Sequence, residues 1–219
     1  MDVFLRKGGM VKMIPVIPQP EPAGFDRDVR QKGHEWLKKN GIDLNSAPQN
    51  PSKLPTLWRK YNEKLWDSYS GVCAYLAFYF EFASGAVNTD HFIAKSKDAG
   101  NAYEWDNYRL ACLSANQRKN KYDDVLDPFT IPQDVFFLCL VTGKIYVSPL
   151  LKKQNEMLAK QAEKTIMRLK LDNQTNRKMR VRHIDEYYAT KKHSSDAAVE
   201  LLLKHNPFVY HEMKRQKKL

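Results

Sequence analysis

The chain contains little cysteine and no long apolar run. Three cysteines in 219 residues is a small, odd number that argues against a disulfide framework. The longest apolar-rich stretch, residues 72–86, is interrupted by Glu81 and is too short to span a bilayer. Residues 1–12 carry charges and glycines and lack the apolar core of a secretory signal. These absences favour a cytoplasmic protein without membrane insertion.

Acidic residues are scarce in the last third of the chain. The sequence has 36 Lys and Arg against 25 Asp and Glu, a net charge of +11. Residues 1–150 hold 19 basic and 17 acidic residues, a net of +2, whereas residues 151–219 hold 17 and 8, a net of +9. A basic segment joined to a near-neutral body suggests a polyanionic partner such as nucleic acid, although a solvated helix surface gives the same composition.

Prolines and polar clusters divide the chain into three parts. Residues 13–22 hold four prolines, which predicts an extended segment that lies on the body of the protein. Residues 47–55 hold three more and predict a loop. We therefore expect an N-terminal extended arm and helix (1–55), a core with a β-hairpin (56–149), and a basic C-terminal helical region (150–219) that forms one compact unit with the core.

Apolar spacing predicts the elements of the first half. Helices are expected over residues 26–40 and 56–69, with Asp26 and Thr56 as their N-caps. Residues 72–82 are dense in aromatic side chains and fit either a strand or a buried helix, which periodicity alone does not distinguish.

The second half predicts short strands followed by helices. Two strands, a helix, a hairpin and a helical region are expected, in this order, over residues 86–90, 108–112, 114–122, 135–147 and from 150 onward. Ser114 would cap the helix over residues 114–122, and Gly143 would lie in the hairpin turn. Asn173 and Asn206 mark breaks between the C-terminal helices. The pattern as a whole predicts an α+β fold.

Four polar residues around the two short strands could share one site. Asp90 and His91 end the first strand, Asn107 precedes the second, and Asn116 lies in the helix that follows. An imidazole can activate a water near neutral pH, and a hard divalent cation takes carboxylate and amide oxygens while keeping waters. Neighbouring side chains on a strand point to opposite faces, so Asp90 and His91 can serve one site only where the chain bends.

Each of these residues also has an ordinary structural interpretation. A histidine beside an aspartate is often a hydrogen-bonded pair, and asparagines are common in turns and on helix surfaces. Their joint occurrence in this order favours a site for phosphodiester hydrolysis.

The segments Asp90-His91-Phe92, Asp106 to Leu110 and Asn116 to Lys119 resemble the ββα-metal motif of HNH endonucleases. The resemblance implies a ββα-metal core plus a hairpin, flanked by N-terminal and C-terminal helices. It implies that His91 is the general base, and that Asp90 and Asn116 bind one divalent cation, Mg²⁺ or Mn²⁺. It also implies that Asn107 holds the loop between the strands and orients the His91 backbone.

The sequence departs from many HNH domains in its cysteines. Those domains bind a structural zinc through two Cys-x-x-Cys pairs, whereas here Cys73 and Cys112 are followed three residues later by Leu76 and Ala115. Two thiolates do not complete a tetrahedral site, so we expect no structural zinc. A small apolar cluster would replace the metal, with both cysteines buried and inert.

Residues 55–170 also resemble the compact HNH nucleases of bacterial anti-phage systems of the Septu, retron and Zorya type. Trp58, Cys73-Ala74-Tyr75 and Asp127-Pro128-Phe129 belong to this signature. The resemblance implies an effector of antiviral defence that nicks or cuts DNA of phage or plasmid origin. A subunit of a defence system would be a further partner, and the sequence leaves the oligomeric state open.

Basic side chains near the motif are expected to contact the sugar-phosphate backbone without reading sequence. These side chains are Lys95, Lys97, Arg118, Lys119 and Lys121. A second cluster could follow the duplex or be a solvated helix face, and it comprises Arg177, Lys178, Arg180 and Arg182. We expect low sequence specificity and a strong dependence on salt. The alternatives are an HNH effector that cleaves RNA or tRNA, and a nucleic-acid-binding subunit that does not cleave.

Overall fold

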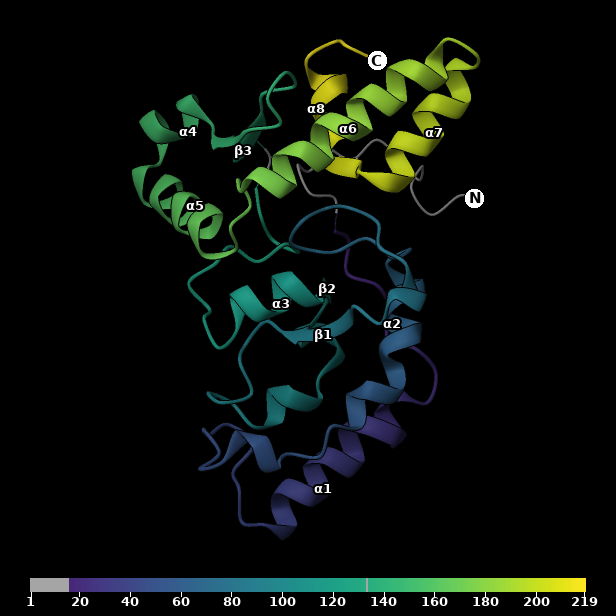
Figure 1. Cartoon of the computed structure of the whole chain (residues 1–219). Helices are drawn as coiled ribbons and strands as arrows, with labels where there is room; N and C mark the ends of the chain where they lie inside the picture. The colour runs from purple at the N-terminus through teal and green to yellow at the C-terminus, as the bar shows by residue number, and fades with distance from the viewer. Residues whose placement is uncertain (1–15, 133) are drawn as a thin grey trace.

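The computed structural model describes residues 16–132 and 134–219, and it has an α+β fold of helices and two small sheets (Figure 1). The expected α+β class is confirmed at this level. Figure 1 places the N-terminal helix α1 at one end of the molecule and the C-terminal helices at the other, with β1, β2 and α3 between them. Residues 1–15, which include the stretch analysed for a signal, lie outside the described residues. No helix within the described ranges has the length and apolar character needed to cross a membrane.

The first helix forms where the sequence predicts it. A π-helical turn, η1 (Asp26–Gln31), continues into α1 (Lys32–Lys39). Asp26 is not the N-cap, because Phe25 occupies that position; Asp26 lies in the first turn, where its carboxylate accepts hydrogen bonds from the side chains of Arg30 and Gln31.

The second helix also forms, as a 3-10 turn, η3 (Leu57–Tyr61), followed by α2 (Asn62–Ser68). Thr56 occupies the N-cap position but makes no side-chain hydrogen bond there, so this predicted cap is wrong as well. The described part of the proline-rich lead-in does lie on the body, since the Gln19 carbonyl accepts a bond from the indole of Trp105. The other 3-10 turns are η2 (Pro51–Lys53), η4 (Phe82–Ser84), η5 (Gly100–Tyr103) and η6 (Trp105–Asn107).

The aromatic segment 72–82 is mostly neither strand nor helix. It folds back on itself through a single bridge between Val72 and Tyr79, and η4 begins at its last residue. The Ala74 amide donates to the Leu110 carbonyl, which packs the segment against the central strands.

The central elements are β1 (Val87–His91), β2 (Tyr108–Cys112) and α3 (Leu113–Lys119). The two strands are antiparallel, and His91 at the end of β1 pairs with Tyr108 at the start of β2. All five residues of β2 are buried. Ser114 lies inside the first turn of α3 and is not its cap, because the helix starts one residue earlier than the sequence predicts.

The predicted hairpin is present as β3 (Phe136–Leu138) and β4 (Ile145–Val147), which pair antiparallel. Gly143 in its turn has φ +67°, and a Cβ at this position would lie 2.3 Å from the Arg177 carbonyl oxygen. Glycine is therefore required both by the backbone conformation and by the close approach.

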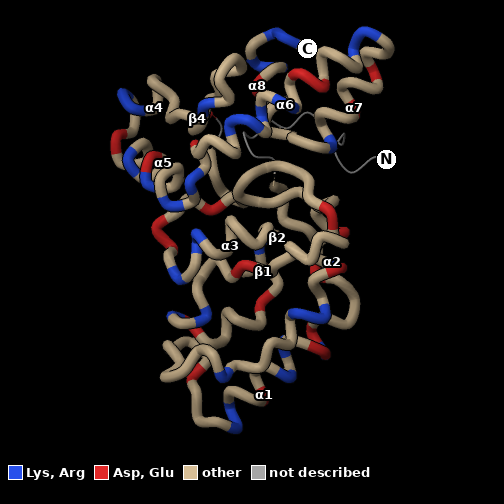
Figure 2. Tube along the Cα trace, viewed as in Figure 1, with Lys and Arg blue, Asp and Glu red and all other residues tan. Residues whose placement is uncertain are grey.

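Five helices follow the hairpin: α4 (Pro149–Gln154), α5 (Glu156–Arg168), α6 (Gln174–Lys191), α7 (Ser195–His205) and α8 (Pro207–Arg215). Asn173 and Asn206 separate them as expected, because each side chain caps the helix that follows. Figure 2 shows Lys and Arg along these helices with Asp and Glu interspersed among them.

Candidate active site

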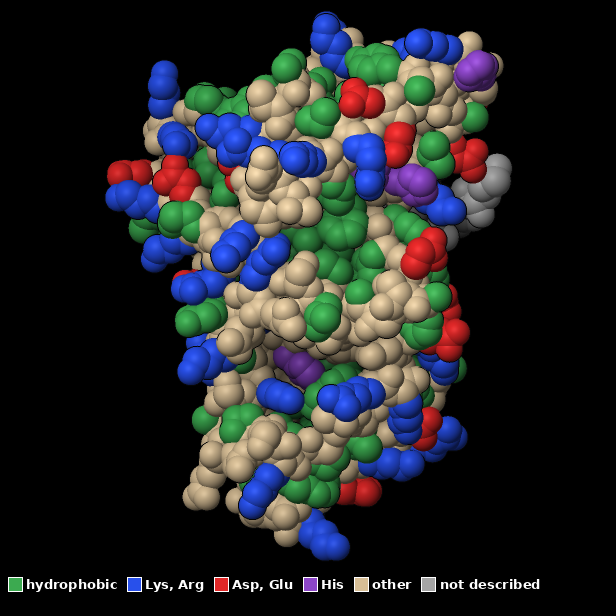
Figure 3. All heavy atoms as spheres, viewed as in Figure 1, with side chains coloured by type: hydrophobic (Ala, Val, Ile, Leu, Met, Phe, Trp, Pro, Cys, Tyr) green, Lys and Arg blue, Asp and Glu red, His purple; other side chains and the backbone are tan. Residues whose placement is uncertain are grey.

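A cavity of about 620 Å³ opens between β1, the loop that follows it, α3 and the η2–η3 segment. Asp90, His91 and Asn116 all line this cavity. The structure thus brings together three of the four residues that the sequence singles out, although two of them are neighbours on a strand. Figure 3 shows a hollow in this face of the molecule with a histidine in its wall and Lys or Arg side chains beside it.

Asn107 holds the loop that leaves β1. Its side-chain oxygen accepts from the Ile93 amide at 2.7 Å, and its Nδ2 donates to the carbonyls of Ile93 and Asn101 at 3.0 and 2.8 Å. Its own carbonyl accepts from the Phe92 amide at 2.9 Å. Asn107 is not among the residues that line the cavity. We therefore describe it as a positioning residue rather than as a catalytic one.

The His91 ring is fixed in one orientation and in one tautomer. Its edge-to-face neighbours are Trp58 and Tyr108, with ring centroids at 4.5 and 5.1 Å. Its Nε2 lies 3.0 Å from the Ala102 carbonyl oxygen. A carbonyl can only accept, so Nε2 carries the proton and Nδ1 is the basic nitrogen. Burial lowers the pKa of His91 to about 3, and the positive charges of Lys95 and Lys119 act in the same direction, so the imidazole is neutral at physiological pH.

Asp90 is almost fully buried beneath the cavity. Its Oδ2 accepts a hydrogen bond from the Tyr75 hydroxyl and lies 3.4 Å from Lys119 Nζ. Burial raises the pKa of the Asp90 carboxyl, and Lys119 opposes this rise. Both contacts are to Oδ2, and Oδ1 could hold a cation.

Lys119 has a different role from the one the sequence suggests. We expected it to contact nucleic acid, but its side chain is completely buried. Its Nζ donates to the His91 carbonyl at 2.7 Å and balances the charge of Asp90. The long side chain reaches inward from α3, so this residue stabilises the end of β1 and does not face a substrate.

Asn116 projects from α3 toward β1. Its Nδ2 lies 3.4 Å from the Asn88 side-chain oxygen, so the Asn116 amide oxygen could coordinate a cation. In the described parts of the chain, no three His, Cys, Asp or Glu side chains are grouped as a metal site. A cation here would depend on Asp90, Asn116 and waters. Hard oxygen donors of this kind fit Mg²⁺ or Mn²⁺, which retain water ligands.

The other basic residues near the motif, which are predicted to contact the sugar-phosphate backbone, differ in their surroundings. Lys95 and Lys121 line the cavity, as does Arg59, which the sequence analysis missed. Lys97 forms an ion pair with Asp123 outside the lining, and Arg118 donates to the Leu169 carbonyl.

The second predicted cluster lies on α6, and none of its four members lines the cavity. Arg177 pairs with Asp172, and Arg182 lies 3.5 Å from Glu186, while Lys178 is exposed. Arg180 is buried and donates to the carbonyls of Gly143 and Leu171, so its assignment to nucleic acid is wrong.

Cys73 and Cys112 are buried neighbours, as expected. The Cys112 amide lies 3.5 Å from the Cys73 sulfur, and Leu76 and Ala115 are buried with them. A hydrogen bond from Cys73 lowers the pKa of Cys112, whereas burial raises that of Cys73. The absence of zinc remains a prediction.

Comparisons of the chain with protein-family models, with curated proteins and with solved structures find no match. The function is therefore argued from the site itself. Two residues of the site, Trp58 and Tyr75, belong to the wider signature noted in the sequence. That signature singles them out but does not indicate which residues they contact. Arg59 directly follows Trp58, and no spacing or motif distinguishes it from other surface arginines.

Proposed function

We propose that this protein is a metal-dependent HNH endonuclease that hydrolyses phosphodiester bonds of DNA. The main support is the cavity shared by Asp90, His91 and Asn116, in which His91 is neutral with its Nε2 proton held by a backbone carbonyl. The order β1, β2, α3 agrees with the ββα-metal motif that the sequence resembles.

In the proposed reaction, His91 Nδ1 accepts a proton from a water molecule in the cavity. The water oxygen forms a bond to phosphorus while the bond from phosphorus to the 3′ oxygen breaks. The departing 3′ oxygen takes up a proton from solvent, and the products are a 5′ phosphate and a 3′ hydroxyl. Asn107 supports this step by holding the loop next to His91.

Asp90 and Asn116 would hold the divalent cation. A bound cation would neutralise charge on the phosphoryl group and on the leaving oxygen. Lys119 positions the same region, because it contacts both the Asp90 carboxylate and the His91 carbonyl.

A single site of this kind would cleave one strand at a time, so a monomer would nick duplex DNA. Cutting both strands would require a dimer or two successive events. A role in anti-phage defence is the further proposal that the sequence resemblance supports.

Supercoiled plasmid incubated with Mg²⁺ or Mn²⁺ tests the proposal. We expect nicked product with the wild type, none in the presence of a chelator, and a loss of activity in His91→Ala. His193→Ala, which removes an exposed histidine far from the cavity lining, is the matched control and should behave as the wild type. Unchanged cleavage by His91→Ala would overturn the mechanism. Cleavage of tRNA but not of plasmid would favour the RNA alternative, and binding without turnover would favour the non-cleaving one.

A further inference from the structure

Two cations lie on the part of the cavity wall that is built by segments other than α3. Arg59 belongs to η3, and Lys95 belongs to the loop that follows β1. Both line the cavity. Lys95 Nζ lies 5.0 Å from the ring centroid of Trp58, the residue directly before Arg59.

Neither cation has an acidic partner in an ion pair among residues 16–132 and 134–219. This distinguishes them from Lys97 and Lys119, which pair with Asp123 and Asp90. Burial lowers the pKa of Lys95, and the nearby charge of Arg59 lowers it further. Two like charges close together without a counterion repel each other, and a bound anion would relieve this repulsion.

The cavity wall offers little for the recognition of bases. Trp58 is the only Phe, Tyr or Trp of the lining within the described residues, and it is 6% exposed, with His91 against its ring and Lys95 over it. Proteins that bind single strands usually present open aromatic rings on which bases stack. Most other lining side chains are amides and hydroxyls, which suit contacts to phosphates and sugars.

We infer that Arg59 and Lys95 form a clamp for one backbone phosphate of duplex DNA, next to the phosphate that is cut. Lys121, on the α3 side of the cavity, would contact the backbone from the opposite wall. The inference rests on the proposed function, because it takes the cleaved strand to pass over His91. The clamp contributes to binding and leaves the chemical step to His91.

The test is binding of a short fluorescein-labelled duplex, followed by anisotropy at several salt concentrations in the presence of a chelator, so that no cleavage occurs. Arg59→Gln and Lys95→Gln should each weaken binding by about 3- to 10-fold. If both cations hold the same phosphate, the double variant should reduce the slope of log affinity against log salt by about 0.9, as expected for one lost phosphate contact. Arg59→Lys and Lys95→Arg, which keep the charge, should bind as the wild type.

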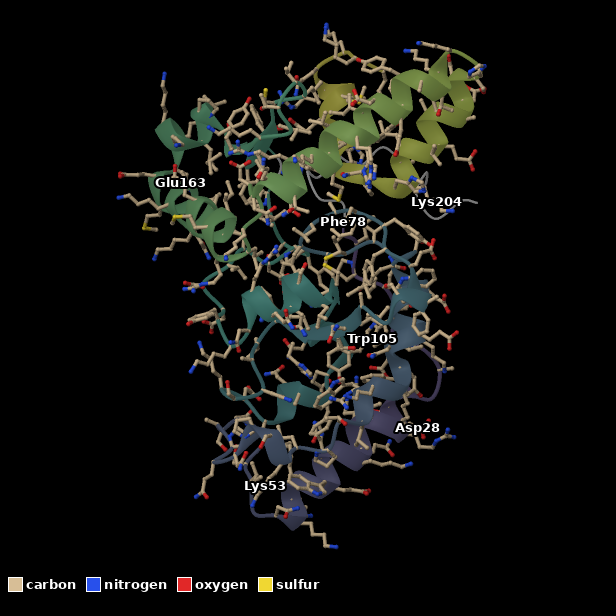
Figure 4. The ribbon with its side chains drawn as sticks, in the orientation of Figure 1. Asp28, Lys53, Phe78, Trp105, Glu163 and Lys204 are labelled. Atoms are coloured by element: carbon tan, nitrogen blue, oxygen red, sulfur yellow. The ribbon has the colours of Figure 1, made fainter. Side chains whose placement is uncertain are left out.

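Lys53→Gln is the matched control. Lys53 is an exposed lysine of η2, labelled in Figure 4, and it does not line the cavity. Equal loss of affinity in Lys53→Gln, or unchanged binding in the Arg59→Gln and Lys95→Gln variants, would overturn the clamp. Tighter binding of a single strand or of tRNA than of the duplex would overturn the choice of substrate.

Cleavage assays separate this inference from the proposed function. If cleavage requires His91 while the Arg59 and Lys95 variants bind normally, the function stands and the clamp is wrong. If these variants lose affinity while no nucleic acid is cleaved with any metal, Arg59 and Lys95 still hold a backbone phosphate and the endonuclease proposal is wrong. With an active enzyme, the clamp variants should raise KM and leave kcat unchanged.

Discussion

The region around the candidate site and the C-terminal helical region use their positive charge in different ways. Residues 151–219 carry a net charge of +9, nearly all of the excess of the chain. Yet two of the arginines on α6 face acidic partners and Arg180 donates to buried carbonyls. Around the cavity the cations are fewer, but Arg59, Lys95 and Lys121 line the space that a substrate would enter.

This difference shows that local net charge is a poor guide to the surroundings of individual basic side chains. A long arginine or lysine side chain can reach inward to a carboxylate or carbonyl as readily as outward to solvent. The choice depends on acceptors that come from distant parts of the sequence. For Lys119 these acceptors are on β1, and for Arg180 they include the hairpin turn.

The largest difference between the two regions is expected when a histidine of each is replaced by alanine. His91→Ala should reduce the rate of cleavage by about 10²- to 10⁴-fold, because it removes the general base. His183→Ala in α6 should leave this rate unchanged, since its ring contacts Asn206 and lies in the C-terminal helices. Single-turnover kinetics on a labelled duplex compare the two variants. A loss of comparable size in His183→Ala would place catalytic function in both regions.

Buried cations should differ in their contribution to the free energy of unfolding. Lys119→Met leaves Asp90 buried without its counter-charge and should lower this free energy by about 3–5 kcal/mol. Arg180→Met leaves only carbonyls without a donor and should cost about 1–3 kcal/mol.

Urea unfolding measures both changes. The double variant Asp90→Asn, Lys119→Met should regain part of the stability that Lys119→Met loses, because no unpaired charge remains buried. If Arg180→Met proved the more destabilising substitution, the expectation that a lost counter-charge costs more than lost donors to carbonyls would be wrong.

The sequence predicts most of the elements, because their signals are local. Helical spacing, the Gly143 turn and the helix breaks at Asn173 and Asn206 depend on residues close together in the chain, and the structure bears them out. The predicted caps Asp26 and Ser114 fail because Phe25 and Cys112 occupy the N-cap positions, and Thr56 fails because its side chain makes no hydrogen bond there. Residues 72–82 were ambiguous because their conformation is set by packing against β2.

The candidate site could be predicted only in part. Asp90, His91 and Asn116 stand in a recognisable order, and the structure places them on one cavity. The buried position of Lys119 depends on the space beneath β1, and the exposure of Arg59 to the cavity depends on how η3 packs. Neither property has a signal in the sequence, since both depend on tertiary contacts.

Acid should destabilise the C-terminal helices through their buried histidines. Burial lowers the pKa of His211 to about 4, and that of His183 is also lowered. Unfolding restores a pKa near 6.5, so the unfolded state binds more protons and the free energy of unfolding falls as pH decreases from 6.5 toward 4. His211→Phe should remove about 1–2 kcal/mol of this loss. Thermal unfolding at pH 7.5 and pH 5 measures it, and an unchanged pH dependence would contradict the assignment.

The smallest effect is expected for the exposed cations of α6. Lys178→Gln with Arg182→Gln should change duplex affinity by less than about 2-fold, because exposed and acid-paired charges contribute little and are screened by salt. The comparison is with the Arg59→Gln, Lys95→Gln double variant in the same anisotropy assay. Both double variants remove two positive charges, so a general electrostatic attraction would weaken binding equally in the two. Equal losses would show that the net charge of the protein, rather than the cations that line the cavity, governs its affinity for DNA.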